Sequence, residues 1–220
     1  IELRIMAHLS KDTELLDAFN NNIDIHSRTA SLIYNASIDE IIPEMRRTAK
    51  VVNFGIMYGA GAFRISQELG VSRGVAQDII DEYFKKYSGI KSYFDQILDN
   101  AKKNKYVETI FGRRRPIWDA DSDNTLKRKA SERIAINMPI QGSAAELIKI
   151  AMIDIHKKLT EEKLKAKMIL QIHDELLFEF PKDEEDMLVS MVLNSMEKAM
   201  DLSVPLVVDY GIGNNWFEAH

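Results

Sequence analysis

The stretch LQIHDELLFEF, residues 170–180, places three ionisable residues, His173, Asp174 and Glu175, between two apolar runs. Apolar side chains alternate with others on both sides, which predicts two strands joined by a tight turn. Such turns usually contain Asn-Gly or Asp-Gly because they need positive φ angles, and this turn has no glycine. Adjacent carboxylates on a rigid turn are hard ligands that suit Mg²⁺. The stretch therefore predicts either a divalent-metal site or an ordinary acidic surface turn.

The patterns on either side of this hairpin predict an α+β fold, mostly helix with a small antiparallel sheet late in the chain. Helices are expected over residues 1–10, 12–19, 24–34, 43–58, 72–87, 91–103, 124–159 and 183–199. Extended segments are expected at 106–118, with a turn at Gly112, and at 205–213.

Single residues mark several helix ends. Asp12 and Asp24 are suited to N-cap positions, since a carboxylate accepts hydrogen bonds from free backbone N–H groups. Pro43 suits a first helical turn, where its missing N–H has no cost. Pro139 lies inside the longest helical pattern, so a kink or a restart is expected there.

The composition is that of a soluble globular protein, with 45% hydrophobic and 29% charged residues. The 220 residues can form one large domain or two subdomains. There is no cysteine, which fits a reducing compartment and excludes disulfides and thiolate metal sites. The net charge is −5, but residues 102–133 hold ten Lys and Arg against five Asp and Glu. This basic segment can attract phosphates even though the whole chain is acidic.

The stretch RRTAKVVNFGIMYG, residues 46–59, places Arg46, Lys50, Phe54 and Tyr58 at intervals of four. On a helix each such step turns by about 400°, so the four side chains share one broad face. Cations near the positive end of the helix dipole make sense if an anion such as a polyphosphate joins them there. The aromatic rings that follow can present a flat surface to a base. The alternative is an ordinary amphipathic helix with a solvated basic start and aromatic residues in the core.

Two further stretches carry groups that suit nucleic acid. GRRRP, residues 112–116, can hold a phosphate backbone or form a solvated basic turn. Arg133, Asn137 and Gln141 again recur every four residues, and all three can donate hydrogen bonds. Every base pair offers acceptors in the DNA minor groove. The row therefore predicts either a groove contact that does not read sequence or the polar face of a helix.

Together and in this order, RRTAKVVNFGIMYG, RIAINMPIQGSAAELIK, QIHDELLFEF and GIGNNWFEAH resemble the polymerase domain of bacterial family-A DNA polymerases, as does IELRIMAHLSKD at the start. The resemblance spans essentially the whole chain. It implies a right-hand architecture without the thumb, in which residues 24–120 form fingers and residues 1–23 with 121–220 form palm. It also implies DNA synthesis on primer-template DNA from dNTPs with Mg²⁺, in DNA replication and repair. A monomer in the bacterial cytoplasm, associated with the nucleoid and not with a membrane, is expected.

The resemblance also implies roles for individual residues. Those expected to contact the incoming nucleotide are Arg46, Lys50 and His26 at the triphosphate, Phe54 and Tyr58 at the nucleoside, and Glu2 near the sugar, where it excludes a ribose 2′-OH. Those expected to contact DNA are Arg133, Asn137 and Gln141 in the minor groove and His173 at the primer end. Asp174 is expected to bind the metal with Glu175 beside it, and catalysis to depend on both and on Lys50.

The family's first palm motif reads Asp-Tyr-Ser-Gln-Ile-Glu, and this chain begins at Ile1-Glu2. The Asp that shares two metal ions with Asp174 is thus expected just before residue 1. We expect the chain to be part of a longer protein and to be inactive alone. The alternative is a non-catalytic module that retains nucleotide and DNA contacts.

Overall fold

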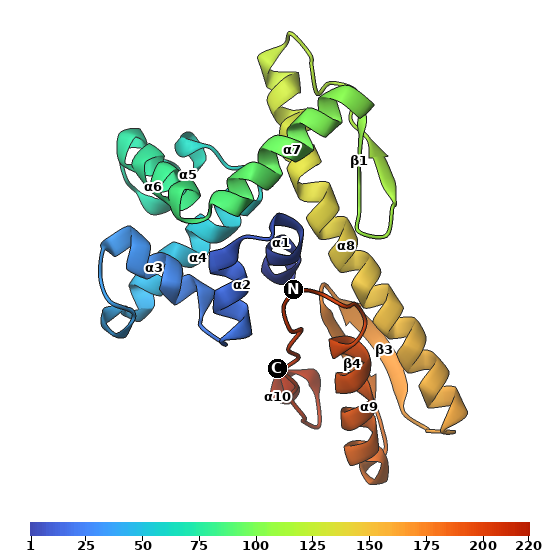
Figure 1. Ribbon diagram of the computed structural model, residues 1–220. Coiled ribbons are helices and arrows are strands. Elements are labelled where there is room, and N and C mark those ends of the chain that lie inside the picture. Colours follow the sequence, from blue (N-terminus) through green and yellow to red (C-terminus); the bar gives the residue numbers. More distant parts are fainter. The chain divides into compact units, whose positions relative to one another are not determined.

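The structure, a computed structural model, describes all of residues 1–220 and is mostly helical (Figure 1). The elements in chain order are α1 (Glu2–Ser10), α2 (Thr13–Asn20), α3 (Ile25–Tyr34), η1 (Ile38–Glu40), α4 (Pro43–Met57), α5 (Ala62–Leu69), α6 (Arg73–Lys86), α7 (Ser88–Asn104), β1 (Tyr106–Glu108), β2 (Arg114–Pro116), α8 (Thr125–Glu161), β3 (Lys167–Ile172), β4 (Glu175–Glu179), η2 (Lys182–Glu184), α9 (Glu185–Glu197) and α10 (Trp216–Ala219). Strands β1–β2 and β3–β4 form two separate antiparallel sheets. The α+β class is confirmed.

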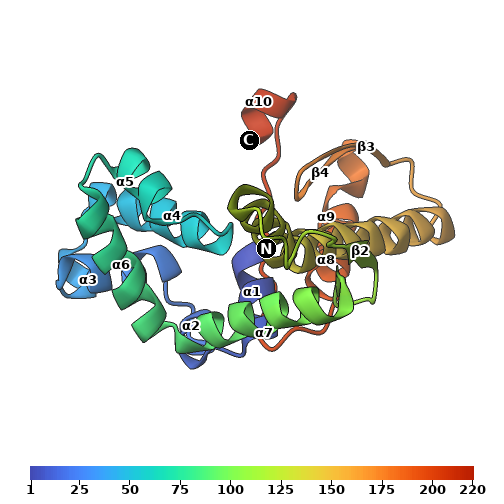
Figure 2. The same ribbon diagram turned by 90° about the horizontal axis from the view of Figure 1, so that it is seen from above.

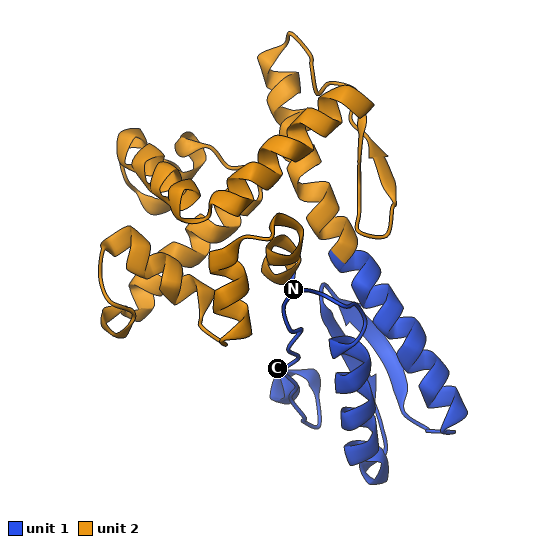
Figure 3. Cartoon of the chain, in the orientation of Figure 1, with its two compact units in different colours: residues 1, 144–220 blue, residues 2–143 orange.

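The chain divides into two compact units (Figure 3). Unit 1 consists of residue 1 and residues 144–220, and unit 2 consists of residues 2–143. Unit 1 contains the β3–β4 hairpin, whereas unit 2 contains α1 to α7 and the β1–β2 hairpin.

Local capping interactions start the first helices of unit 2 as the sequence predicts. Asp12 is the N-cap of α2 and accepts hydrogen bonds from the backbone N–H groups of Glu14 and Leu15. Asp24 caps α3 in the same way, and Pro43 occupies the first turn of α4. These contacts stabilise each start because they satisfy N–H groups that have no partner within the helix.

The helices of unit 2 pack in pairs around buried apolar side chains. Helix α3 packs against α4, and α5 packs against α6, as both views show (Figures 1 and 2). Tyr83 and Tyr87, at the end of α6, are almost completely buried. A second cluster joins α7, the β1–β2 hairpin and α8 through Ala101, Val107 and Ala135. The predicted turn at Gly112 is confirmed, with a φ of 80°.

Helix α8 continues through Pro139 without a break, so the predicted restart is wrong, while a kink within the helix stays a prediction. A proline inside a helix removes one backbone hydrogen bond and costs about 3 kcal/mol. Burial on both sides of the proline offsets this cost, because Ala135, Ile136 and Ile140 are almost fully buried. Ser143 Oγ also donates a hydrogen bond of 2.5 Å to the Pro139 carbonyl.

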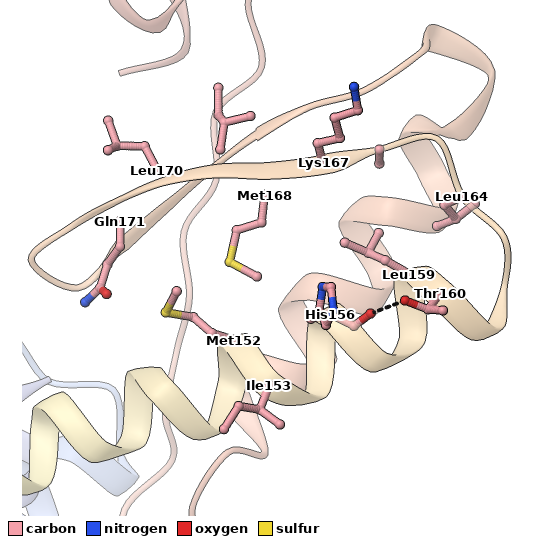
Figure 4. A pocket seen from close by; sticks show the side chains of 12 residues that line it. Met152, Ile153, His156, Leu159, Thr160, Leu164, Lys167, Met168, Leu170 and Gln171 are labelled. Atoms are coloured by element: carbon pink, nitrogen blue, oxygen red, sulfur yellow. Dashed lines mark hydrogen bonds between the residues drawn. The ribbon is translucent and has the colours of Figure 1, made fainter.

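In unit 1 the β3–β4 hairpin packs with α9 and the second half of α8. Ile155, Leu159, Ala166 and Leu188 form the buried centre of this cluster. Met168 pairs with Phe178 and Leu170 with Leu177, so Ile169 is an extra residue in β3, a β-bulge. An open groove of about 880 Å³ lies between α8 and β3, and its lining includes Met152, His156 and Met168 (Figure 4). The predicted site residues do not line it.

The strand predicted at 205–213 is absent, because this segment pairs with no other strand. Val207, Tyr210 and Ile212 are exposed, so alternating apolar residues alone did not produce a strand here. No helix of the structure combines the length and the apolar character that crossing a membrane requires.

Candidate functional site

The predicted face of α4 is present in unit 2. Arg46 and Lys50 are exposed in the first half of the helix, while Phe54 and Tyr58 are partly buried at its end. The Phe54 and Tyr58 rings stack with centroids 6.1 Å apart and planes inclined by 26°. Two cations therefore precede a pair of stacked rings along one helix.

His26 of α3 lies beside this face. Its ring centroid is 5.8 Å from that of Phe54, and its side chain is only 9% exposed. Burial lowers the pKa of His26, the Asp24 carboxylate raises it, and the Arg46 and Lys50 charges lower it further. The pKa of His26 lies below its usual value as a result, and the imidazole is neutral at neutral pH.

Arg46 makes a bidentate ion pair with Asp24, the N-cap of α3. Arg46 Nε donates to Asp24 Oδ1 at 3.0 Å, and Nη2 donates to Oδ2 at 2.7 Å. Burial raises the pKa of Asp24, but the hydrogen bonds from Arg46 and Ser27 outweigh burial and bring this pKa to about 2. An anion that binds Arg46 must therefore compete with a carboxylate.

At the other end of α4, Tyr58 donates its hydroxyl hydrogen bond to a Glu2 carboxylate oxygen. The turn after Tyr58 comes close to α8. A Cβ atom on Gly59, whose φ is 71°, would lie 3.1 Å from Arg133 Cγ. The structure thus brings Glu2, Tyr58 and Arg133 to the same end of α4.

Helix α8 carries the three residues predicted to contact the DNA minor groove. Arg133 and Gln141 are exposed, and Asn137 is half-buried. The side-chain oxygen of Asn137 is buried and has no hydrogen-bond partner. Arg133 and Gln141 can therefore donate to a ligand in solvent, whereas Asn137 is only partly accessible to one. All three lie in unit 2.

The β3–β4 hairpin of unit 1 has a two-residue turn, His173–Asp174, because Ile172 pairs directly with Glu175. His173 has a φ of 54°, in the left-handed region where side chains other than Gly are uncommon. The unusual backbone that replaces glycine is therefore at the histidine, not at the carboxylates. Asp174 is exposed at the tip of the turn.

Glu175 begins β4 and contacts the C-terminal helix α10. Trp216 Nε1 donates to Glu175 Oε1 at 3.4 Å, and His220 Nδ1 lies 3.6 Å from the same oxygen. Asp174 and Glu175 offer the oxygen atoms that suit Mg²⁺. No group of three or more His, Asp or Glu side chains in the structure is arranged to hold a metal ion.

Two partners were not predicted from the sequence: Asp24 as the partner of Arg46, and Asn53 as the partner of His26. Asn53 Nδ2 lies 3.0 Å from His26 Nδ1, and Asn53 is fully buried. A signal was present, because Asn53 falls on the apolar face of α4 with Ala49 and Ile56. A polar residue on such a face needs a buried hydrogen-bond partner.

Comparison with known proteins shows the family. A sequence model of DNA polymerase family A matches residues 1–218. DNA polymerase I of Bacillus caldotenax is 47% identical over 219 residues, which are 100% of this chain and 25% of that protein. DNA polymerase I of Caldicellulosiruptor bescii is 48% identical over 218 residues, 99% of this chain and 26% of that protein. The chain spans about a quarter of the length of these relatives.

A solved structure gives the same result. The polymerase domain of Pol1 from M. smegmatis, in complex with DNA primer-template and dNTP, superimposes with a TM-score of 0.96 at 42% identity. The match covers 100% of this chain and 39% of the solved one. The chain belongs to DNA polymerase family A.

Proposed function

We propose that this chain forms the fingers and part of the palm of a template-directed DNA polymerase. Residues 24–120 are assigned to the fingers, and residues 1–23 and 121–220 to the palm. In the proposed reaction a primer 3′-hydroxyl attacks the α-phosphate of a dNTP and pyrophosphate leaves. The observation that carries the proposal is the convergence of His26, Arg46 and Phe54 in unit 2, a chain of family-A sequence.

The proposed triphosphate contacts are His26, Arg46 and Lys50. The Arg46 and Lys50 charges are close enough to His26 to lower its pKa, so the three side chains can reach one polyanion. A bound triphosphate takes the place of the Asp24 carboxylate at Arg46. Lys50 remains a cation beside the reacting phosphates and stabilises the charge that develops there.

The proposed nucleoside contacts are Phe54 and Tyr58, with Glu2 at the sugar. The hydrogen bond from Tyr58 holds Glu2 at the end of α4. A carboxylate fixed there leaves no room for a ribose 2′-OH, which selects deoxyribonucleotides. Arg133, Asn137 and Gln141 are assigned to the minor groove of the primer-template and His173 to the primer end.

Asp174 is the proposed metal ligand, with Glu175 beside it. Polymerases of this family use divalent metal ions, and carboxylate oxygens on a short, rigid turn fit Mg²⁺. Asp174, with Glu175 beside it, would hold Mg²⁺, which would supply positive charge that stabilises the phosphoryl transfer. The second aspartate of such a site is assigned to the family's Asp-Tyr-Ser-Gln-Ile-Glu motif.

Primer extension tests the proposal in a protein that carries this chain together with that motif. Asp174→Ala should nearly abolish single-turnover extension and leave primer-template affinity largely unchanged, because affinity comes from many backbone contacts. Asp183→Ala, an exposed carboxylate elsewhere in unit 1, is the matched control. A fall of less than about tenfold for Asp174→Ala, roughly 1.4 kcal/mol of barrier, would remove the metal assignment.

A module that binds nucleotide and DNA without chemistry is the second candidate for the 220-residue chain. The observation in its favour is that the hairpin carries two adjacent carboxylates and no larger acidic cluster. This candidate predicts that the purified chain binds dNTP and primer-template but does not extend the primer. Extension by the chain itself would exclude it.

A further inference from the structure

Four buried polar side chains form a continuous hydrogen-bonded chain in unit 2. The Tyr87 hydroxyl lies 3.0 Å from Thr29 Oγ1, and Thr29 Oγ1 donates to Asn53 Oδ1 at 3.1 Å. Asn53 Nδ2 in turn lies 3.0 Å from His26 Nδ1. Tyr87, Thr29 and Asn53 are completely buried, and His26 is 9% exposed. This series of hydrogen bonds thus connects the junction of α6 and α7 with α3, α4 and the candidate nucleotide site.

The Tyr87 hydroxyl determines which group donates and which accepts in each of these hydrogen bonds. Burial raises the pKa of Tyr87 to about 12, although its hydrogen bond with Thr29 lowers it, so the hydroxyl keeps its proton. Thr29 Oγ1 is the hydrogen-bond partner that the structure provides for this hydroxyl, so Tyr87 donates and Thr29 accepts. The single proton of Thr29 is then directed to Asn53 Oδ1.

The hydrogen bond from Thr29 also orients the side-chain amide of Asn53. With Oδ1 on Thr29, the Nδ2 amino group faces His26 Nδ1, which must accept the hydrogen bond. If the amide were flipped, Thr29 Oγ1 would accept a hydrogen bond from Asn53 Nδ2. The Thr29 hydroxyl would then donate its own hydrogen bond to the Tyr87 oxygen. The buried proton of Tyr87 would then have no acceptor, which costs about 1–3 kcal/mol.

We propose that Asn53 is a positioning residue that fixes His26 as the neutral tautomer with its proton on Nε2. This inference rests on the proposed role of His26 at the triphosphate and adds how that role is secured. With Nδ1 held by Asn53, Nε2–H is the group left to donate to a phosphate oxygen. In the other tautomer Nε2 would present a lone pair to the anion and repel it.

The charged groups around His26 act on its protonation and leave its tautomer to Asn53. Asp24 favours the imidazolium, while Arg46, Lys50 and burial favour the neutral ring. The Phe54 ring, whose centroid is 5.8 Å from that of the imidazole, offers no proton acceptor among its ring atoms. Asn53 is therefore the neighbour that distinguishes the two ring nitrogens.

Nitrogen-15 NMR of the histidine side chains tests the proposal in the purified protein. We expect His26 in the wild type to be protonated on Nε2. Thr29→Val is nearly isosteric but removes the proton that orients Asn53, so both tautomers should be populated. Because only the Nε2–H form is competent, apparent dATP affinity, measured by calorimetry, should then fall by about twofold for equal populations of the two tautomers.

Three variants control this experiment. Thr29→Ser keeps the hydroxyl and should retain the wild-type tautomer and dATP affinity. Tyr87→Phe removes the first donor and should reproduce Thr29→Val, which provides a second route if Thr29→Val does not fold. Tyr83→Phe removes a buried hydroxyl from the neighbouring ring, whose centroid is 4.7 Å from that of Tyr87. It should change neither the His26 tautomer nor the dATP affinity.

Two results would overturn the inference: a wild-type His26 protonated on Nδ1, or an unchanged Nε2–H tautomer in both Thr29→Val and Tyr87→Phe. His26→Ala separates this inference from the proposed function. If dATP affinity is unchanged in His26→Ala, the triphosphate role fails while the tautomer assignment stands or falls on the NMR result. If His26→Ala weakens dATP binding but the tautomer does not respond, the function survives and the role of Asn53 is refuted.

Discussion

At the scale of the residue, Phe54 carries the sharpest expectation. Its ring lies between those of His26 and Tyr58, at centroid distances of 5.8 and 6.1 Å. Resemblance to family-A polymerases associates Phe at this position with rejection of dideoxynucleotides and Tyr with their acceptance. The 3′-OH of the sugar can make a polar contact within the bound nucleotide. A dideoxy sugar lacks this hydroxyl, and a Tyr hydroxyl can replace the contact that is lost. Phe54 cannot.

We therefore expect Phe54→Tyr to relax discrimination against ddNTPs by at least about tenfold, since a hydrogen bond contributes on the order of 1 kcal/mol and more where a buried oxygen would be left unpaired. The measurement is the ratio of incorporation efficiencies, dNTP over ddNTP, on one template. Phe63→Tyr, on the exposed face of α5, is the control and should leave the ratio unchanged. An unaltered ratio in Phe54→Tyr would mean that this ring does not face the sugar.

At the scale of the element, Asp12 connects the starts of two helices. Its Oδ1 accepts from the N–H groups of Glu14 and Leu15, both at 3.1 Å, and its Oδ2 accepts from Gly89 N–H at 2.8 Å. Gly89 permits this approach, because a Cβ there would lie 2.7 Å from Asp12 Cα. One buried carboxylate thus caps α2 and fixes the first turn of α7.

Asp12→Ala should lower the free energy of unfolding by about 2–3 kcal/mol, because it removes a cap and leaves a part-buried N–H without a partner. Gly89→Ala should also destabilise, since the added methyl group meets backbone atoms that cannot move aside. Ser72→Ala, which removes an exposed cap of α6, should cost about 1 kcal/mol or less. Urea unfolding followed by circular dichroism gives these values, and equal losses for Asp12→Ala and Ser72→Ala would contradict the double role of Asp12.

At the scale of the whole molecule, ion-paired carboxylates with lowered pKa values should contribute to the loss of stability in acid. A hydrogen bond from Lys86 has the largest effect on the pKa of Glu14 and lowers it, while burial raises it and a hydrogen bond from Arg28 lowers it further. A hydrogen bond from Lys158 lowers the pKa of Asp154. Asp24, with its pKa of about 2, belongs to the same group. A carboxylate whose pKa is lower in the folded state stabilises the fold above its unfolded pKa and loses this contribution as the pH falls toward the folded value.

The free energy of unfolding should therefore decrease between about pH 4 and pH 2, the window set by the ordinary and folded pKa values of Asp24. Asp24→Asn keeps a side chain that caps helices well but cannot ionise. Its stability should fall less steeply than that of the wild type across this window. Urea midpoints at pH 6, 4 and 3 for both proteins provide the measurement, and parallel pH profiles would show that the Arg46 pair does not stabilise the fold.

The sequence by itself determined the features that depend on neighbours along the chain. The caps at Asp12 and Asp24, the start of α4 at Pro43 and the β3–β4 hairpin all follow from contacts within a few residues. The α+β class and the broad face of α4 follow from periodicity for the same reason. Sequence motifs taken together in order were also sufficient to indicate the family, which the comparisons show.

Only the tertiary structure decided the features that need partners far away in sequence. Burial around Pro139 lets α8 continue through a residue that disfavours helix, and the absence of a partner strand leaves 205–213 unpaired despite its pattern. The pairing of Arg46 with Asp24 and the chain from Tyr87 to His26 join residues that lie 22 to 58 positions apart. Such contacts depend on how helices pack, because a side chain's own neighbours fix its conformation but not what it meets across the core.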